Sequence, residues 1–331
     1  MSREIIHGED ARLPVAGVLS SLRSFIKRDN TAAFLAGGVA GALSRTAVSP
    51  FERVKVLYQV QGTSKATQSY RHGVLRSVAQ IWREEGLKGL YRGNGVNCFR
   101  VFPYSAVQYS VYQQLKSVLG TGPAESRQLD VPSKLFAGAV AGMASVVATY
   151  PLDLVKTRLS VQTASLKNLS TSRIDGNTRK PPGMFRSLVK IYTEEGGVLA
   201  LYRGLLPTIL GVAPYVAINF SIYEKLKEQL PVQYQHNAIL TMAIGAVSGG
   251  IGQSLIYPFD ILRRRFQVLT LGTGEMGFKY NSIWDAFRTI WRTEGTRGLF
   301  KGWVANMWKI MPSMAVQWAS YDLVKELIKI L

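Results

Sequence analysis

The sequence has 331 residues, 47% of them hydrophobic, and its 40 Lys and Arg against 21 Asp and Glu give a formal net charge of +19. This surplus favours anionic partners and leaves nucleic acid, anionic lipid and an acidic small molecule as alternatives. The single cysteine, Cys98, excludes an intramolecular disulfide, and three scattered histidines give little support to a histidine metal site or a catalytic triad.

The first thirty residues mix charges of both signs and contain no long apolar core. We therefore predict a tail over residues 1–30 that is neither a secretory signal nor a calcium-binding loop.

Six apolar-rich segments follow in pairs, each pair joined by a polar stretch: 31–59 with 90–119, 132–160 with 200–228, and 238–267 with 299–328. They exceed the roughly 20 residues that a helix needs to cross a bilayer. They also contain polar residues, such as Gln253 in the fifth segment. Polar side chains inside membrane segments usually face a bundle interior or water. The segments therefore predict a bundle of membrane helices with a polar interior.

The segments belong to a threefold repeat. The motif P-x-[DE]-x-x-[KR] begins at Pro50, Pro151 and Pro258. Each copy follows two glycines spaced four residues apart and precedes an E-G…[YF]-[RK]-G element and a Tyr-x-x-x-Lys element. Soluble helical arrays have shorter repeats, of about 20–50 residues, and avoid such glycines and prolines. We predict repeats over 31–121, 132–230 and 238–331.

The triplicated motifs resemble those of the mitochondrial carrier family. Stretches such as RGNGVNCFRVFPYSAVQ and ATYPLDLVKTRLSVQTA are most similar to its adenine-nucleotide-type branch, in particular to fungal carriers of adenosine phosphosulfates. The resemblance implies an all-α membrane protein with six transmembrane helices in three pseudo-threefold two-helix repeats, and short helices on the matrix side. It also implies that the protein is not an enzyme and needs no cofactor or metal.

By the same resemblance, the proline motifs form a matrix gate of ion pairs. The expected pairs are Glu52 with Lys156, Asp153 with Arg263, and Asp260 with Lys55. Gln59 and Gln267 resemble glutamines that brace such pairs, whereas Ser160 stands at the third equivalent position.

A second gate is expected on the cytoplasmic side, where Glu224 pairs with Lys325 and Asp322 with Lys116. Gln113 stands where an acid is usual, so Lys227 can donate only to a neutral amide oxygen and loses its ion pair. Pairs in which both groups are charged are stronger than bonds to a neutral acceptor, so this gate should be the looser of the two. Tyrosines at the same level could reinforce it, namely Tyr112, Tyr223 and Tyr321.

The substrate site is predicted where the threefold symmetry breaks. At one equivalent level of the even-numbered helices stand Arg100, Gly211 and Lys309. The two cations can hold phosphate groups. In the family, a small residue followed by an aliphatic one, here Gly211 and Val212, lies beside an adenine base. The remaining candidates are Arg45, Tyr215, Tyr104, Gln108, Asn219 and Gln317.

These residues predict a carrier, expected to be an antiporter, of an anionic adenine-nucleotide-like solute, such as adenosine 5'-phosphosulfate or its 3'-phosphate, across the mitochondrial inner membrane. ATP-Mg/phosphate and coenzyme A or adenosine bisphosphate are alternative solutes, and the peroxisomal membrane is an alternative location. We expect a monomer with anionic lipid such as cardiolipin as partner, and no nucleic acid. A basic peripheral nucleic-acid-binding helical protein is the alternative from another class, supported by the net charge alone.

Overall fold

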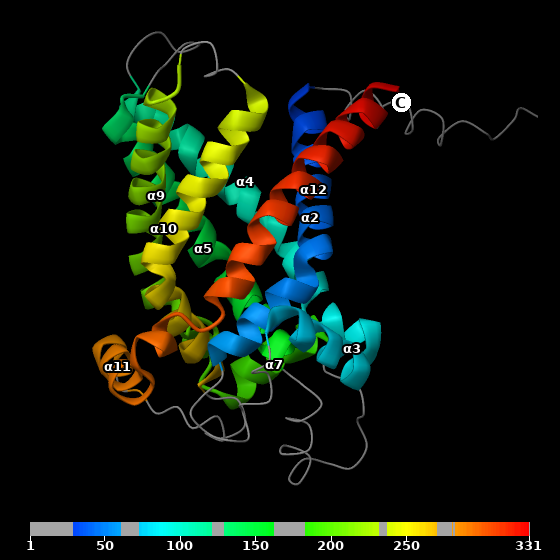
Figure 1. The fold of residues 1–331 in the computed structure, drawn as a ribbon, viewed down its shortest axis with the longest axis vertical. Coiled ribbons are helices and arrows are strands. Elements are labelled where there is room, and N and C mark those ends of the chain that lie inside the picture. Colours follow the sequence, from blue (N-terminus) through cyan, green and yellow to red (C-terminus); the bar gives the residue numbers. More distant parts are fainter. Residues whose placement is uncertain are drawn as a thin grey trace, which may run out of the picture.

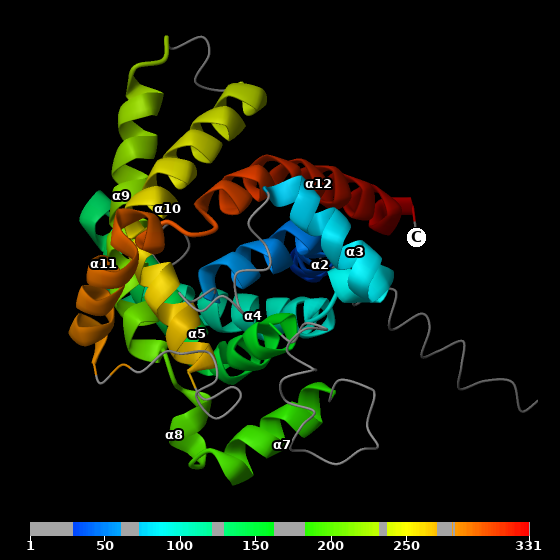
Figure 2. The ribbon, with the colours of Figure 1, turned by 60° about the horizontal axis from the view of Figure 1, so that its bottom comes forward.

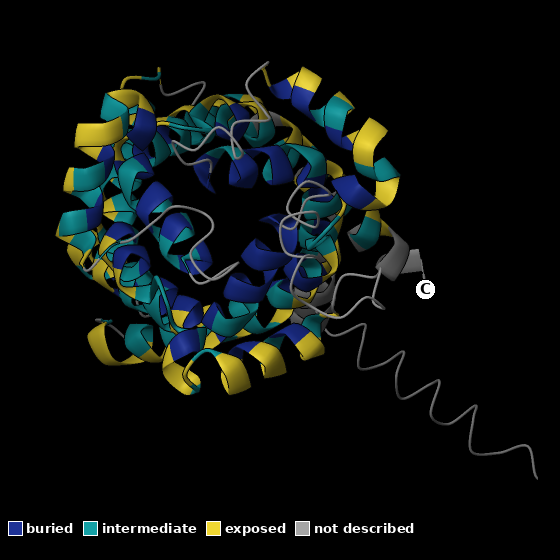
Figure 3. Ribbon diagram, turned by 90° about the horizontal axis from the view of Figure 1, so that it is seen from below, coloured by how far each residue is buried: buried dark blue, intermediate teal, exposed yellow. Residues whose placement is uncertain are grey.

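The computed structural model describes residues 29–60, 73–120, 129–161, 183–231, 237–269, 280 and 282–330. Every regular element in this part is a helix, and six of them are long: α2 (Asp29–Val60), α4 (Asn94–Leu119), α5 (Val131–Val161), α9 (Leu205–Glu228), α10 (Ala238–Val268) and α12 (Trp303–Ile330). The long helices form a ring, in which α12 packs back against α2 (Figures 1 and 3). The six predicted segments and their arrangement in three two-helix repeats are confirmed.

Shorter helices gather at the end of the ring where α2, α5 and α10 finish, which we call the basal end (Figure 2). They are α3 (Val74–Leu90), α7 (Met184–Glu194), α8 (Val198–Leu201) and α11 (Ile283–Leu299). Three of them are amphipathic and bury one isoleucine each against the ring, namely Ile81, Ile191 and Ile290. The predicted short helices of the three repeats are therefore present.

The second long helix of each repeat (α4, α9 and α12) begins a few residues later than predicted from the sequence. A glycine with positive φ precedes each of them: Gly93 (85°), Gly204 (84°) and Gly302 (81°). A Cβ on Gly93 would also lie 3.0 Å from the carbonyl oxygen of Lys156 in the next repeat. Side chains are disfavoured at positive φ, so glycine ends the preceding short helix here and allows two repeats to approach closely.

In the described part of the chain, three spans have the length and apolar composition of membrane-crossing helices: Val131–Val161, Val198–Glu228 and Ile239–Val268. The long helices contact one another through small residues. Gly41 lies against Val101 and Gly142 against Val212, with 3.2 and 3.3 Å between the position of an added Cβ and the valine Cγ1. Such small residues allow membrane helices to pack closely in the absence of a hydrophobic driving force.

Candidate functional site

The acids and bases of the three proline motifs meet at the basal end. Lys156 Nζ lies 3.0 Å from Glu52 Oε2, Arg263 Nη2 lies 2.5 Å from Asp153 Oδ2, and Lys55 Nζ lies 3.2 Å from Asp260 Oδ2. We call these six residues the proline-motif ring. Each pair joins the first long helices of two different repeats. Together the three pairs therefore connect α2, α5 and α10 into a closed triangle. The three pairings are those expected from the sequence; their role as a gate remains a prediction.

The two glutamines support this ring in different ways. Gln267 Nε2 donates to Asp153 Oδ2 at 2.9 Å and to the Tyr150 hydroxyl at 3.2 Å. Gln59 Nε2 donates to the Tyr257 hydroxyl at 3.2 Å, and the ring of this tyrosine lies 5.5 Å from Lys55 Nζ. The two tyrosines were not predicted from the sequence, although each directly precedes a motif proline. A buried tyrosine and a glutamine therefore accompany two of the three ion pairs.

The third ion pair, Glu52 with Lys156, has no such unit. Ser49 and Ser160 stand at the corresponding positions. Ser160 Oγ donates to the backbone carbonyls of Lys156 and Arg92, at 2.8 and 3.3 Å. Ser49 Oγ donates to the carbonyl of Leu90 at 3.4 Å. The ring is therefore asymmetric at the junction of α2 with α5.

A further cation, Arg264, contacts Asp153 and was not predicted from the sequence. Arg264 Nη1 lies 3.3 Å from Asp153 Oδ2 and donates to Gln267 Oε1 at 2.9 Å and to the Thr157 hydroxyl. The equivalent residues of the other two repeats, Val56 and Thr157, are uncharged. This difference between the three copies of the motif is the feature from which Arg264 could have been predicted.

Beneath the ring, each repeat holds a buried arginine against the glutamate of its E-G element. The three pairs, which we call the basal pairs, are Arg53–Glu85, Arg158–Glu195 and Arg265–Glu294, each with one nitrogen and one oxygen 2.8 Å apart. The arginine Nε atoms donate to backbone carbonyls of the next repeat, those of Ser160, Gln267 and Gln59, at 3.2, 3.1 and 3.4 Å. The basal pairs thus join each short helix to its own repeat and to the following one.

The glutamates of the basal pairs are shared with the basic residue of the [YF]-[RK]-G element. Arg92, Arg203 and Lys301 contact Glu85, Glu195 and Glu294 respectively. Burial alone would raise the pKa of Glu294, but hydrogen bonds and charge from Arg265, with Lys301, hold this pKa below its ordinary value. The E-G glutamates were recognised as motif residues from the sequence, but their basic partners were not predicted.

Four buried valines pack together at the basal end. Val56, Val60, Val161 and Val268 form one cluster and are at most 3% exposed. We call this group the valine cluster. Contributed by α2, α5 and α10, it joins the same three helices as the proline-motif ring and adds an apolar layer to the polar one.

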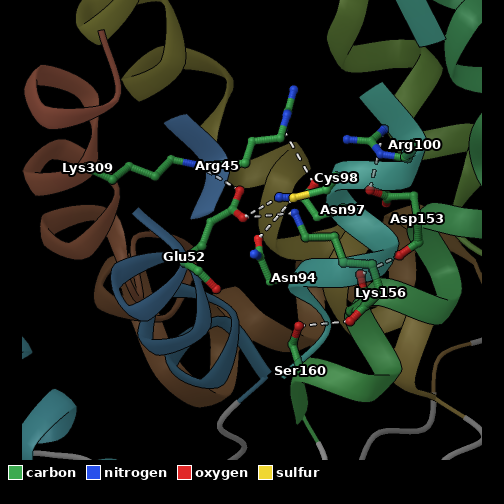
Figure 4. A network of polar contacts seen from close by, with 12 residues as sticks. Arg45, Glu52, Asn94, Asn97, Cys98, Arg100, Asp153, Lys156, Ser160 and Lys309 are labelled. Carbon is green, nitrogen blue, oxygen red and sulfur yellow. Dashed lines mark hydrogen bonds and ion pairs between the residues drawn. The ribbon is translucent and has the colours of Figure 1, made fainter. Parts of the chain in front are cut away.

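Two of the cationic side chains predicted to bind substrate, Arg100 and Lys309, point toward the proline-motif ring (Figure 4). Arg100 Nη1 lies 3.7 Å from Asp153 Oδ1, and Lys309 Nζ lies 3.4 Å from Glu52 Oε1. The Arg100 guanidinium also lies over the Tyr104 ring, 5.6 Å from its centroid. Both contacts with carboxylates are longer than those within the ring. The two cations predicted to bind substrate are therefore held loosely by ring carboxylates.

Arg45, the third candidate cation, is linked to the ring through Asn97. Arg45 Nη1 lies 3.5 Å from Asn97 Oδ1, and Asn97 Nδ2 donates to Glu52 Oε2 at 3.0 Å (Figure 4). Asn97 is only 1% exposed. It was not among the predicted site residues, and no pattern in the sequence distinguishes it.

The candidates on α9 lie in helix contacts. A Cβ on Gly211 would lie 3.2 Å from Ile256 Cγ2, so the bare side of this glycine faces α10. Val212 packs on Gly142 of α5, as described above. The Tyr215 hydroxyl and Asn219 Oδ1 lie 3.9 and 3.8 Å from the position of a Cβ on Gly249 of α10. Among the remaining candidates, Gln108 and Gln317 are exposed.

The opposite end of the ring of helices carries what we call the tyrosine-motif ring: Gln113, Lys116, Glu224, Lys227, Asp322 and Lys325. The side chains of Tyr321, Asp322 and Lys325 lie outside the described part, and with them the expected pairs Glu224–Lys325 and Asp322–Lys116. The described Lys227 Nζ lies 6.0 Å from the centroid of the Tyr223 ring. Gln113 is exposed and Tyr112 half-buried. Within the described side chains, no ion pair joins Lys116, Glu224 and Lys227 to one another.

Comparison with known proteins gives one consistent result. A family model described as "Mitochondrial carrier protein" matches three consecutive segments, 27–123, 127–233 and 234–330. The chain is 51% identical over 318 residues to an uncharacterized mitochondrial carrier of Saccharomyces cerevisiae, covering 94% of this chain and 96% of that protein. It is 39% identical to a mitochondrial adenine nucleotide transporter of Arabidopsis thaliana (97% and 92% covered). It is 36% identical to the mitochondrial carrier protein CoAc1 of Zea mays (89% and 86% covered).

Proposed function

This chain belongs to the mitochondrial carrier family, whose members are transporters and not enzymes, and we propose that it exchanges anionic adenylates across the mitochondrial inner membrane. The preferred solutes are adenosine 5'-phosphosulfate and its 3'-phosphate. Membership of this transporter family argues against the alternative of a peripheral nucleic-acid-binding protein. The basal end corresponds to the matrix side in this proposal, and the tyrosine-motif ring to the cytoplasmic side.

One observation carries the proposal: the three candidate cations all reach the proline-motif ring, directly or through one side chain. Arg100 lies 3.7 Å from Asp153 and Lys309 lies 3.4 Å from Glu52, with side chains that are 14% and 23% exposed. Such long contacts are weaker than the 2.5–3.2 Å pairs of the ring. A phosphate or sulfate group can compete for these cations, bidentately at the planar Arg100 guanidinium.

This competition supplies a mechanism for alternating access. An anionic solute that draws Arg100 and Lys309 away from Asp153 and Glu52 loosens the links between the ring and helices α4 and α12. A ligand can shift a conformational equilibrium only by its difference in affinity for the two states. Here that difference arises because the solute and the ring carboxylates share the same cations. Opening of the matrix gate is thereby tied to occupation of the site.

The adenine ring is proposed to lie along α9, beside Gly211, Val212 and Tyr215. Direct contact with Gly211 and Val212 requires α9 to separate locally from α10 and α5, because both residues are engaged with these helices. Two relatives support an adenylate as solute: the Arabidopsis thaliana protein is named an adenine nucleotide transporter, and another Arabidopsis thaliana relative, 34% identical over 313 residues, is named a thylakoid ADP,ATP carrier. Coenzyme A and ATP-Mg/phosphate remain the alternative solutes.

The test is an exchange panel with the purified protein in liposomes. Vesicles loaded with one adenylate are supplied externally with adenosine 5'-phosphosulfate, its 3'-phosphate, ATP-Mg or coenzyme A, and uptake is compared with that of unloaded vesicles. Fastest exchange of the phosphosulfates supports the proposal. Preference for coenzyme A or ATP-Mg transfers the assignment to that alternative, and absence of exchange with every adenylate overturns it. Uptake into unloaded vesicles at the same rate would contradict antiport.

A further inference from the structure

We propose that Asn97 is a positioning residue for the ion pair between Glu52 and Lys156, where it replaces the missing tyrosine–glutamine unit. The proposal rests on the proposed function for its consequence in transport, but its structural part stands independently of any solute. The starting point is the asymmetry of the proline-motif ring described above.

The contact made by Asn97 reproduces the contact made by Gln267. Gln267 Nε2 donates to Asp153 Oδ2, the oxygen that also binds Arg263, at 2.9 Å. Asn97 Nδ2 donates to Glu52 Oε2, the oxygen that also binds Lys156, at 3.0 Å. In both cases a buried amide shares one carboxylate oxygen with the cation of the ion pair. A hydrogen bond of this kind holds the carboxylate in the orientation that the cation requires.

The two amides approach from different elements. Gln267 lies at the end of α10, the same helix that contains Arg263, the cation of the ion pair. Asn97 belongs to the start of α4, within the same repeat as Glu52. Asparagine therefore supplies the hydrogen bond from the second long helix of the repeat of Glu52, and not from the helix that carries Lys156. The Ser160 hydroxyl instead donates to backbone carbonyl groups.

The equivalent positions in the other repeats provide an internal comparison. Thr208 donates to the carbonyl of Gly204 in its own helix at 2.8 Å. Asn306 is 2% exposed, and its Nδ2 has no hydrogen-bond partner within the described residues. Both lie in repeats whose ion pairs already have a tyrosine and a glutamine. An amide at this position therefore engages a ring carboxylate only at the junction that lacks the glutamine.

Asn97 also connects the proline-motif ring to the cationic side chains that we propose bind substrate. Its Oδ1 faces Arg45 at 3.5 Å, while Glu52 uses its other oxygen to contact Lys309 at 3.4 Å. Among the described residues, no cation proposed to bind substrate makes a comparable contact with the pair of Lys55 and Asp260. The additional donor to this pair is Gln253, whose Nε2 lies 2.7 Å from Asp260 Oδ2. Occupation of the site by an anion would thus loosen the Glu52 junction through both Arg45 and Lys309. We infer that α2 and α5 separate early when the matrix gate opens.

A reporter inside the basal end tests the positioning role without any solute. In a Cys98→Ala background, Val268→Cys places a thiol in the valine cluster, where it is shielded until the helix ends separate. The rate of maleimide labelling of the purified protein then measures opening of the basal end. Asn97→Ala is expected to raise this rate about tenfold, since a hydrogen bond to a charged group is worth roughly one order of magnitude in an equilibrium.

Asn306→Ala is the matched control, because it removes the same side chain at the same burial without touching a ring carboxylate. Its labelling rate is expected to stay within about twofold of the parent, the range of a small local change. Equal labelling of the Asn97→Ala and Asn306→Ala variants would overturn the proposal.

Restoring the unit found at the other two junctions provides the rescue. The triple variant Asn97→Ala, Ser49→Tyr, Ser160→Gln should return labelling to the parent rate, since it supplies the tyrosine and glutamine that the other pairs possess. A general loss of packing would not be rescued, and failure of rescue in a folded triple variant would refute the equivalence of the two devices. If labelling behaves as expected but no adenylate is exchanged, the positioning role survives and the proposed function fails.

Discussion

The two ends of the helix ring differ in how their charges are arranged. At the basal end, three ion pairs, three basal pairs and the valine cluster join α2, α5 and α10 in successive layers. At the opposite end, the described members of the tyrosine-motif ring make no ion pair with one another. In the structure the basal end is thus held together by one polar ring, a set of buried arginine–glutamate pairs and an apolar cluster. If this end is the matrix gate that we propose, its opening must break all three kinds of contact.

The largest effect is expected from removing Arg100, the cation that we propose links the substrate to the basal end. Arg100→Ala should reduce adenylate exchange in liposomes by at least about a hundredfold, because removing one partner of a desolvated charge interaction costs 2–5 kcal/mol or more. Arg100→Lys should recover only part of the rate, since lysine cannot bind bidentately. Arg186→Ala, on the exposed face of α7, is the control. Unchanged exchange by the Arg100→Ala variant would remove Arg100 from the site.

The basal pairs offer a test by transplantation. Arg158 and Arg265 stand seven residues after their motif prolines, whereas Arg53 stands only three after its own, one helical turn earlier, and Leu57 takes the later position. Arg53→Leu should destabilise the detergent-solubilised protein by about 3–5 kcal/mol, because it leaves the buried Glu85 without this partner. The exchange variant Arg53→Leu, Leu57→Arg recreates the order of the other repeats and should restore most of the lost stability in thermal unfolding.

A transplanted arginine that gives no recovery would show that the one-turn displacement is essential to this repeat. The single variant Leu57→Arg serves as the control for the cost of removing a buried leucine from its cluster. Its unfolding temperature separates that cost from the loss of the ion pair.

A smaller effect should distinguish the junctions that have a glutamine from the junction that has Ser160 in its place. Gln267→Ala removes hydrogen bonds to Asp153 and Tyr150 and should destabilise the protein by about 1–3 kcal/mol, the cost of leaving buried polar groups unsatisfied. Ser160→Ala removes only hydrogen bonds to backbone carbonyls and should cost about 1 kcal/mol or less. Thermal unfolding of the two variants under identical conditions makes the measurement. Equal losses would contradict the assignment of Gln267 as a brace.

The smallest effect is expected at the opposite end. Glu224→Gln should change thermal stability by about 1 kcal/mol or less, because Glu224 is only half-buried and exposed ion pairs contribute little. Its effect should instead be seen in the exchange rate, if closure of the cytoplasmic side depends on this carboxylate. A loss of stability as large as that of Arg53→Leu would invalidate the contrast between the two ends.

The sequence by itself determined the features that recur in every repeat. The paired apolar segments and three copies of each motif predicted six long helices in three repeats. The family that these motifs resemble implied the short helices and the three ion pairs of the proline-motif ring. The departures at Gln113 and Ser160 were also visible, since a broken repeat is read directly from the aligned copies. The late starts of the even-numbered helices were missed, because positive φ at Gly93, Gly204 and Gly302 depends on how closely the next repeat approaches.

Only the tertiary structure decided which side chains compensate for the broken symmetry. Arg53 takes the place of an arginine one turn away because both positions lie on one face of α2, and Asn97 reaches Glu52 because α4 crosses beside it. Gly211 and Val212, placed in the site by analogy, lie in helix contacts for the same kind of reason. Contacts between helices depend on their rotation and spacing, which sequence periodicity leaves open but packing of side chains defines.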